Sequence, residues 1–193
     1  MKKAASIDPR ALRPELLPNF NRQIEAALGD PESRVLNGDL ATSLVAEAVA
    51  LGASDIHLNP HSSGSRLRLR VDGIVWDVAH LNSEHGRMLV NQFKALANLD
   101  PIVRFVPRDA HAVVRTADNQ IHLRLALAPS LERDTLTVRL VDPKRLERSI
   151  SELGFGRENL QSLHAGLEGV SGRFLTTGPS GSGKTPTLYG LVD

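Results

Sequence analysis

Cysteine is absent from this chain of 193 residues, so it can form neither a disulfide framework nor a thiolate metal site. An excess of charge is also missing: the formal net charge is +1, which creates no bulk field favouring nucleic acid or an anionic membrane. No run approaches the roughly 20 apolar residues of a transmembrane helix. The first ten residues, MKKAASIDPR, carry positive charge without the apolar run of a signal peptide. These absences lead us to expect a cytoplasmic protein without a nucleic-acid partner.

The residues that are present suit a globular protein of one or two domains. Hydrophobic residues make up 41% and charged residues 23% of the chain, enough to build a buried core. Residues 1–33 carry four prolines and few long apolar runs. We therefore expect an amino-terminal arm or linker there, with a short helix near residues 23–28.

Residues 34–147 show the pattern of one α+β domain. Apolar residues at helical spacing follow Asp39, a plausible N-cap, and Gly52 ends that helix. A second helix follows Ser83. Strands are expected at 54–59, 65–71, 74–79, 111–116, 119–127 and 134–140. The pair Asp72-Gly73 predicts a tight hairpin turn. The pattern therefore indicates a sheet of about five or six strands with helices on one side.

Residues 148–193 begin with a helical connection at 148–168 and end in a strand, a loop and a helix. Residues 174–177 read as a buried strand, and a helix opens at about Thr187. Between them stands a G-x-x-x-x-G-K-[S/T] motif, the phosphate-binding loop of nucleotide triphosphatases. Its residues are Gly178, Pro179, Ser180, Gly181, Ser182, Gly183, Lys184 and Thr185.

Each position of this motif has a chemical role toward a phosphate chain. The glycines let consecutive backbone N–H groups turn toward the phosphates. Lys184 would reach the β- and γ-phosphates, and the Thr185 hydroxyl would coordinate Mg²⁺. The motif therefore predicts binding of ATP and Mg²⁺; the alternative is a Gly/Ser-rich surface turn. A serine hydrolase elbow does not fit, because G-x-S-x-G fails around Ser180.

Arginines alternate with apolar residues in two of the expected strands. In residues 65–71 Arg66, Arg68 and Arg70 fall on the face opposite the core, and Arg124 does so in residues 121–125. A solvated sheet face is one interpretation. An arginine finger that neutralises charge at a γ-phosphate is the other.

Histidine and aspartate provide weaker signals. His57 and His61 are four residues apart, but a strand and a turn rather than a helical turn separate them, so they do not predict a metal site. Asp55 and Asp72 lie near strand ends, where turn and capping roles are expected.

Three segments together resemble the ATPases of the type II secretion and type IV pilus assembly family. Residues 52–60 (GASDIHLNP) resemble that family's A-S-D-I-H-x-x-P segment. Residues 66–74 (RLRLRVDGI) resemble its R-x-R-x-R-x-D-G-x strand pair. Residues 177–189 (TGPSGSGKTPTLY) are similar to its phosphate-binding loop and helix. The resemblance covers roughly residues 34–193.

The resemblance implies a fold and an activity. It implies a PAS-like α+β domain, followed by the first strand, P-loop and helix of an incomplete RecA-like α/β ATPase domain. It further implies a hexameric homo-oligomer that binds ATP between its lobes. This ring would lie on the cytoplasmic side of the inner membrane, with secretion or pilus platform proteins as partners. By position, Arg124 and Arg104 match family arginines and are candidate arginine fingers.

The chain also departs from the family pattern. Residues 107–111 read PRDAH where the family has P-Q-D-G-R, and Pro186 stands where the family has threonine. The acidic catalytic residue and the later carboxylate motifs are missing. Our leading interpretation is therefore the ATP-binding portion of a secretion or pilus-assembly motor, truncated after the P-loop and inactive in hydrolysis alone. The alternative is a non-catalytic PAS-like interaction domain with a vestigial P-loop.

Overall fold

The computed structural model describes residues 12–29, 39–103, 106–116, 120–130, 133–143, 149–168, 171–178 and 182–191. The chain separates into two compact units, Met1–Val141 and Asp142–Asp193, each of which is described by itself. The domain boundaries expected at 33/34 and 147/148 stay predictions.

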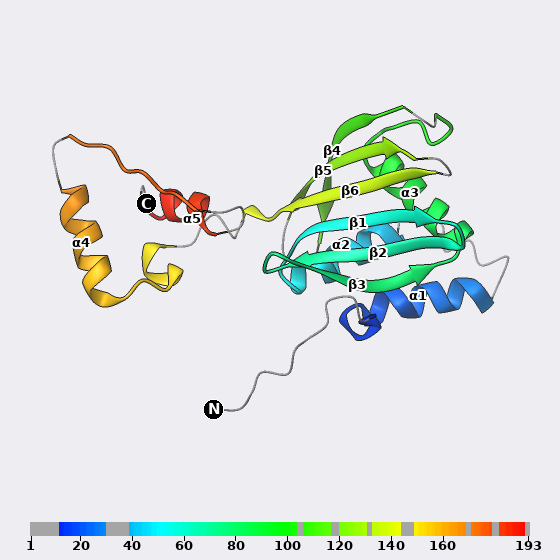
Figure 1. The fold of residues 1–193 in the computed structure, drawn as a ribbon, viewed down its shortest axis with the longest axis horizontal. Coiled ribbons are helices and arrows are strands. Elements are labelled where there is room, and N and C mark those ends of the chain that lie inside the picture. The colour runs from blue at the N-terminus through cyan, green and yellow to red at the C-terminus, as the bar shows by residue number, and fades with distance from the viewer. Residues whose placement is uncertain are drawn as a thin grey trace. The chain divides into compact units, whose positions relative to one another are not determined.

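The first unit is built on a six-stranded antiparallel sheet (Figure 1). The strand order is β3-β2-β1-β6-β5-β4. The sheet thus has two three-stranded halves, β1–β3 and β4–β6, which meet where β1 pairs with β6. The prediction of five or six strands is confirmed. The strands are β1 (Ala53–His61), β2 (Gly64–Val71), β3 (Ile74–Leu81), β4 (Arg108–Arg115), β5 (Gln120–Pro129) and β6 (Asp134–Val141).

Helices α2 (Asp39–Ala50) and α3 (Ser83–Leu96) contact the sheet and enclose its core (Figure 1). Helix α3 begins at Asn82, whose side chain accepts a hydrogen bond of 2.8 Å from the His85 backbone N–H. Strand alternation sends Leu67 and Leu125 into this core, where both are fully buried. The opposite face of the sheet carries the polar residues.

The expected hairpin turn at Asp72-Gly73 is confirmed. Asp72 has φ 50° and Gly73 has φ 80°, the two positive values that a two-residue type I′ turn requires. This turn joins β2 to β3 and fixes their register, in which Val71 faces Ile74. The arginines of β2 therefore lie on one face of the sheet and its leucines on the other.

Residues 12–29 belong to the segment expected to be an arm or linker with a short helix near residues 23–28, and the structure places that helix within a longer one. Helix α1 (Pro18–Gly29) follows the short 3₁₀ helix η1 (Pro14–Leu16), and both Leu17 and Phe20 are fully buried. Glu47 on α2 accepts hydrogen bonds of 2.9 Å from the backbone N–H groups of Asn19 and Phe20. Pro14 and Pro18 stand at helix starts, where proline is tolerated, so they do not mark a linker.

The second unit contains the 3₁₀ helix η3 (Ile150–Leu153) and the helices α4 (Arg157–Leu167) and α5 (Lys184–Tyr189). The predicted buried strand at 174–177 is wrong: Phe174 is 43% and Leu175 84% exposed. A strand needs a neighbour to accept and donate its ladder hydrogen bonds, and no described residue of this unit forms one. Among the described residues no helix is long and apolar enough to cross a bilayer.

Candidate phosphate-binding loop and arginine face

The phosphate-binding motif spans the start of α5. The structure describes Gly178 and Ser182 to Thr185, whereas Pro179, Ser180 and Gly181 lie outside the described residues. Gly183 precedes the helix with φ 88°, a left-handed conformation that a side chain would strain. Lys184 then begins the helix, three residues before the start expected at about Thr187.

The two ends of the loop approach each other closely. The Lys184 ammonium donates a hydrogen bond of 2.9 Å to the Gly178 carbonyl oxygen. A Cβ atom placed on Gly178 would lie 2.6 Å from the Ser182 hydroxyl oxygen, so only glycine permits this closure. Thr185 is exposed. The loop thus brings a cation and an accessible hydroxyl to one glycine-lined turn, a donor set that fits a polyphosphate with a magnesium ion.

Pro186 does not disrupt α5. Its carbonyl oxygen accepts a 2.9 Å hydrogen bond from the Gly190 N–H, and the Thr187 hydroxyl donates to the Gly183 carbonyl at 2.8 Å. Proline is acceptable in the first turn because the N–H it lacks has no partner within the helix. The helix therefore forms, but one backbone donor is missing directly after Thr185.

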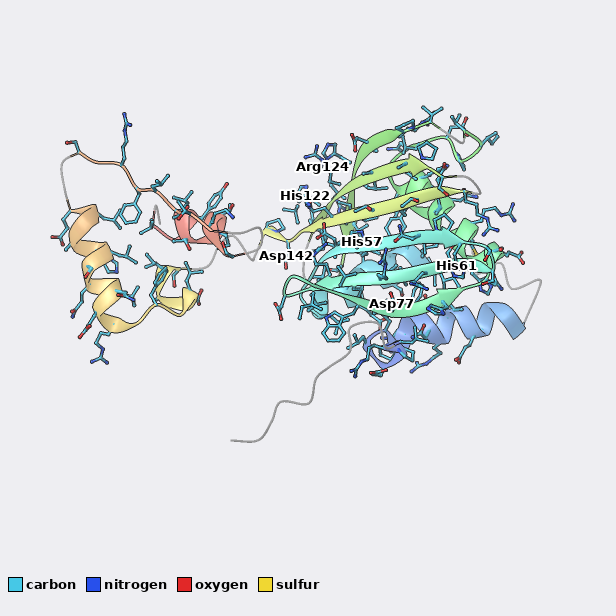
Figure 2. All side chains as sticks on the ribbon, in the orientation of Figure 1. His57, His61, Asp77, His122, Arg124 and Asp142 are labelled. Carbon is cyan, nitrogen blue, oxygen red and sulfur yellow. The ribbon has the colours of Figure 1, made fainter. Side chains whose placement is uncertain are left out.

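On the first unit, the face of the sheet away from α2 and α3 carries Arg66, Arg68, Arg70, Arg124 and Arg139 and is called the arginine face. Figure 2 labels Arg124 on β5. Arg124 on β5 stands directly opposite His111 on β4 and Arg139 on β6. Arg124 is exposed, as predicted, and no hydrogen bond or ion pair joins its side chain to another described residue. Arg104, the second candidate arginine finger, lies outside the described residues.

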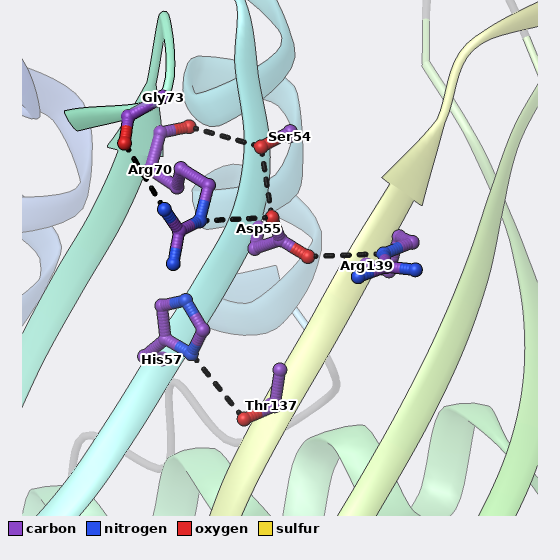
Figure 3. A network of polar contacts seen from close by, with 7 residues as sticks. All are labelled: Ser54, Asp55, His57, Arg70, Gly73, Thr137 and Arg139. Carbon is purple, nitrogen blue, oxygen red and sulfur yellow. Dashed lines mark hydrogen bonds and ion pairs between the residues drawn. The ribbon is translucent and has the colours of Figure 1, made fainter. Parts of the chain in front are cut away.

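Arg139 has an acidic neighbour on its other side. Its Nε donates a 3.1 Å hydrogen bond to the Asp55 carboxylate on β1 (Figure 3). The same carboxylate accepts a 2.8 Å hydrogen bond from the Ser54 hydroxyl, and the Arg70 Nε lies 3.4 Å from it. Asp55 is only 6% exposed. The expected turn or capping role is therefore wrong for Asp55, which is the shared partner of two arginines.

The three arginines of β2 lie on this open face, as predicted, and each has a polar partner. The Arg66 Nε lies 3.7 Å from the Asp77 carboxylate, and Arg68 donates a 2.7 Å hydrogen bond to the Asn59 side chain. Arg70 also donates to the Gly73 carbonyl at 3.0 Å. These contacts hold the β2 arginines against the sheet, which distinguishes them from Arg124.

His57 lies beside this cluster on β1. Its Nδ1 is 3.3 Å from the Thr137 hydroxyl (Figure 3). Burial lowers the pKa of His57, and the charges of Arg70, Arg68 and Arg139 act in the same direction while Asp55 opposes them. Burial therefore favours the neutral form of the ring.

His61, which the sequence places four residues after His57, contacts another histidine rather than a carboxylate. The His61 ring meets the His80 ring edge to face, with centroids 6.3 Å apart. Within the part of the chain that the structure describes, no three His, Cys, Asp or Glu side chains gather into a metal site.

Arg139 was not identified from the sequence, although a signal was present. Residues 136–140, LTVRL, alternate apolar and polar side chains just as residues 121–125 do. That alternation places Arg139 on the same face as Arg124. The partnership with Asp55 could not be inferred, because it depends on β1 pairing with β6 across 84 residues of chain.

Known proteins share sequence with most of this chain. The family model described as "Type II/IV secretion system protein" matches residues 32–193. The chain is 34% identical over 176 residues to the type IV pilus assembly ATPase TfpB of Acinetobacter baylyi, covering 88% of this chain and 30% of that protein. It is 30% identical over 153 residues to the putative type II secretion system protein E of Escherichia coli K12, covering 79% and 31%.

Solved structures share the fold. The ATPase DotB of Legionella pneumophila superposes with a TM-score of 0.56 at 18% identity, covering 78% of this chain and 40% of that one. DotB of Yersinia pseudotuberculosis gives a TM-score of 0.53 at 12% identity, with 80% and 41% coverage. The chain spans about a third of the length of the curated relatives it matches. Through the match over residues 32–193, the chain belongs to the type II/IV secretion system protein family.

Proposed function

We propose that this chain is the ATP-binding portion of a motor ATPase that powers protein export or pilus assembly. The observation that carries the proposal is the 2.9 Å hydrogen bond from Lys184 to the Gly178 carbonyl, which closes a loop of the motif G-x-x-x-x-G-K-T. Family membership supports the same conclusion, because relatives in this family are named as pilus assembly ATPases.

Different groups of the loop would bind different parts of the nucleotide. Backbone N–H groups of the loop, which Pro179 lacks, would bind the phosphate chain, and Lys184 would neutralise the β- and γ-phosphates. The Thr185 hydroxyl would be the protein ligand of the magnesium ion. When bound, Mg²⁺ neutralises charge that develops on the phosphates during transfer.

Arginines of the first unit are the proposed arginine fingers. Arg124 is exposed and lacks an acidic partner among the described residues, so its guanidinium is available to an anion. A guanidinium binds phosphate oxygens in a bidentate manner, which suits an arginine finger. Arg139 faces Arg124 in register and would act beside it. Arg104 remains the other candidate.

The proposal extends to a wider assembly, which family membership supports. The first unit would be the PAS-like lobe, and the loop with α5 would open the RecA-like lobe. Six copies would form a ring on the cytoplasmic side of the inner membrane, contacting secretion or pilus platform proteins rather than nucleic acid.

Amide chemical shifts provide the test of nucleotide binding. Addition of Mg²⁺-ATP to the chain should shift the amide signals of Gly178 and of residues 182–185, and Lys184→Ala should abolish these shifts. The Lys94→Arg variant changes a lysine of the first unit that is buried and paired with Asp134, and serves as the control. Unchanged loop signals at saturating nucleotide would reject the proposal in favour of a non-catalytic interaction domain.

A further inference from the structure

We infer that Asp55 is a positioning residue that holds Arg139 in place beside Arg124 so that the pair can bind a phosphate group. The inference rests on the proposed function, because it assigns the arginine face to the phosphates of a nucleotide. Asp55 itself would not touch the ligand. Its contribution would be exerted entirely through the arginine that it orients.

Arg139 needs an external constraint to stay beside Arg124. Its side chain is 66% exposed, and its neighbour across the β5–β6 ladder is another arginine. Like charges directly opposite each other on a sheet repel, so an unrestrained guanidinium would turn toward solvent. The 3.1 Å contact between the Arg139 Nε and Asp55 opposes this movement.

The form of this contact leaves Arg139 able to bind an anion. Asp55 accepts a hydrogen bond from the Nε of Arg139 rather than from its two terminal nitrogens. The terminal N–H groups are the ones that can fork onto two phosphate oxygens. The carboxylate thus fixes the side chain while leaving its phosphate-binding end open.

Asp55 is itself firmly held. The Ser54 hydroxyl donates to it at 2.8 Å, and Arg70 approaches it at 3.4 Å while donating to the Gly73 carbonyl at 3.0 Å. With 6% exposure, the carboxylate has little freedom to reorient. The hairpin turn, Arg70, Asp55 and Arg139 therefore form a continuous chain of contacts across β2, β1 and β6 (Figure 3).

Removal of the Asp55 carboxylate distinguishes a role in positioning Arg139 from a purely electrostatic effect of its charge on the anion. Asp55→Ala raises the net charge by one, so electrostatic attraction alone predicts tighter binding of an anion. Loss of positioning predicts weaker binding, because the ligand must then order a mobile arginine. Asp77→Ala is the matched control: Asp77 is also buried, lies on the same open face and pairs with Arg66, but its register neighbour is Arg68.

The experiment uses the full chain carrying Lys184→Ala, so that the loop is disabled and inorganic triphosphate reports on the arginine face. The Nε–Hε signals of Arg124 and Arg139 are followed by NMR during the titration. We expect Asp55→Ala to lower the order of the Arg139 Nε–Hε bond before any ligand is added. It should also weaken triphosphate binding at least threefold, whereas Asp77→Ala should leave Arg139 ordered and binding no weaker.

Asp55→Asn provides a second variant if the alanine protein fails to fold. Its amide oxygen can still accept from the Arg139 Nε, so its effects on order and affinity should be smaller than those of alanine. Unchanged Arg139 order in the Asp55 variants, equal or tighter triphosphate binding, or no binding at the arginine face would each overturn the inference. The proposed function is tested separately, by Mg²⁺-ATP binding to the chain that retains Lys184, and absence of that binding would contradict it.

Discussion

Arg124 and Arg139 stand directly opposite each other across the β5–β6 ladder, and of these two arginines only Arg139 pairs with the Asp55 carboxylate. Two like charges in this register weaken the sheet by a few tenths of a kcal/mol up to about 1 kcal/mol. A local conflict of this kind is expected where function, rather than stability, determines the residue. The pair therefore supports a binding role for this face.

Replacement of Arg124 by alanine should cost almost no stability. The side chain is exposed and opposes another arginine, so the free energy of unfolding should change by no more than about 0.5 kcal/mol, if anything upward. Urea unfolding provides the measurement. The neighbouring Leu125→Ala, at a fully buried position, should cost about 2–5 kcal/mol. A comparably large loss for Arg124→Ala would show that Arg124 is structural.

The segment before the family match should behave as part of the core. Phe20 is fully buried, so Phe20→Ala should lower the free energy of unfolding by about 3–5 kcal/mol. Arg22, an exposed residue two positions later on the same helix, provides the control. Arg22→Ala should change the free energy of unfolding by less than about 0.5 kcal/mol. Equal, small effects in denaturant unfolding would mean that α1 does not pack on the domain in solution.

His57 should make the first unit less stable in mild acid. Burial lowers its pKa in the folded state, so below about pH 6.5 the unfolded chain takes up a proton that the folded chain does not. Stability is then fully present above pH 6.5 and declines as the pH falls toward the folded-state pKa. Protonation would also place a cation beside Arg70, Arg68 and Arg139.

The corresponding measurement is the unfolding free energy at pH 7.5 and pH 5.5 for the unaltered chain and for His57→Gln. The difference between the two pH values should be smaller in the variant. His80→Gln, which removes an exposed histidine from β3, is the control for the substitution itself. An identical pH dependence of the unfolding free energy with and without His57 would show that this residue does not cause the acid sensitivity.

Pro186 should weaken nucleotide binding without harming the helix. Its missing N–H removes one donor just after Thr185, and a hydrogen bond to a charged group contributes about 1.5–3 kcal/mol. Pro186→Thr should therefore tighten ATP binding roughly ten- to a hundredfold by calorimetry. Pro186→Ala restores the N–H without a hydroxyl and should give most of the same gain. If both variants bind like the unaltered chain, this N–H is not a phosphate donor.

Local sequence patterns were sufficient for much of the first unit. Period-two alternation predicted the outward side chains of β2 and β5, and Asp72-Gly73 predicted a turn whose φ values the structure confirms. These features depend on residues close together in the chain. The phosphate-binding motif is equally local, and a helix follows it as expected, although α5 starts at Lys184 rather than at about Thr187.

Features that depend on distant partners could not be predicted. The role of Asp55 is set by Arg139, which lies 84 residues away on a strand that pairs with β1. Docking of α1 depends on Glu47, a partner 27 residues from Phe20, and the prolines around the helix gave the opposite signal. Residues 174–177 read as a buried strand because their composition is apolar, but a strand also requires a paired neighbour.

The most direct test of the account is the affinity of the chain for Mg²⁺-ATP, measured by calorimetry with and without Lys184. The unaltered chain should bind at the loop, and Lys184→Ala should weaken binding roughly ten- to a hundredfold, because a charged donor to the phosphates is lost. Circular dichroism of both proteins establishes that the fold is unchanged. Equal affinities for the two proteins, or no binding by either, would contradict the assignment of this chain as the ATP-binding portion of a motor.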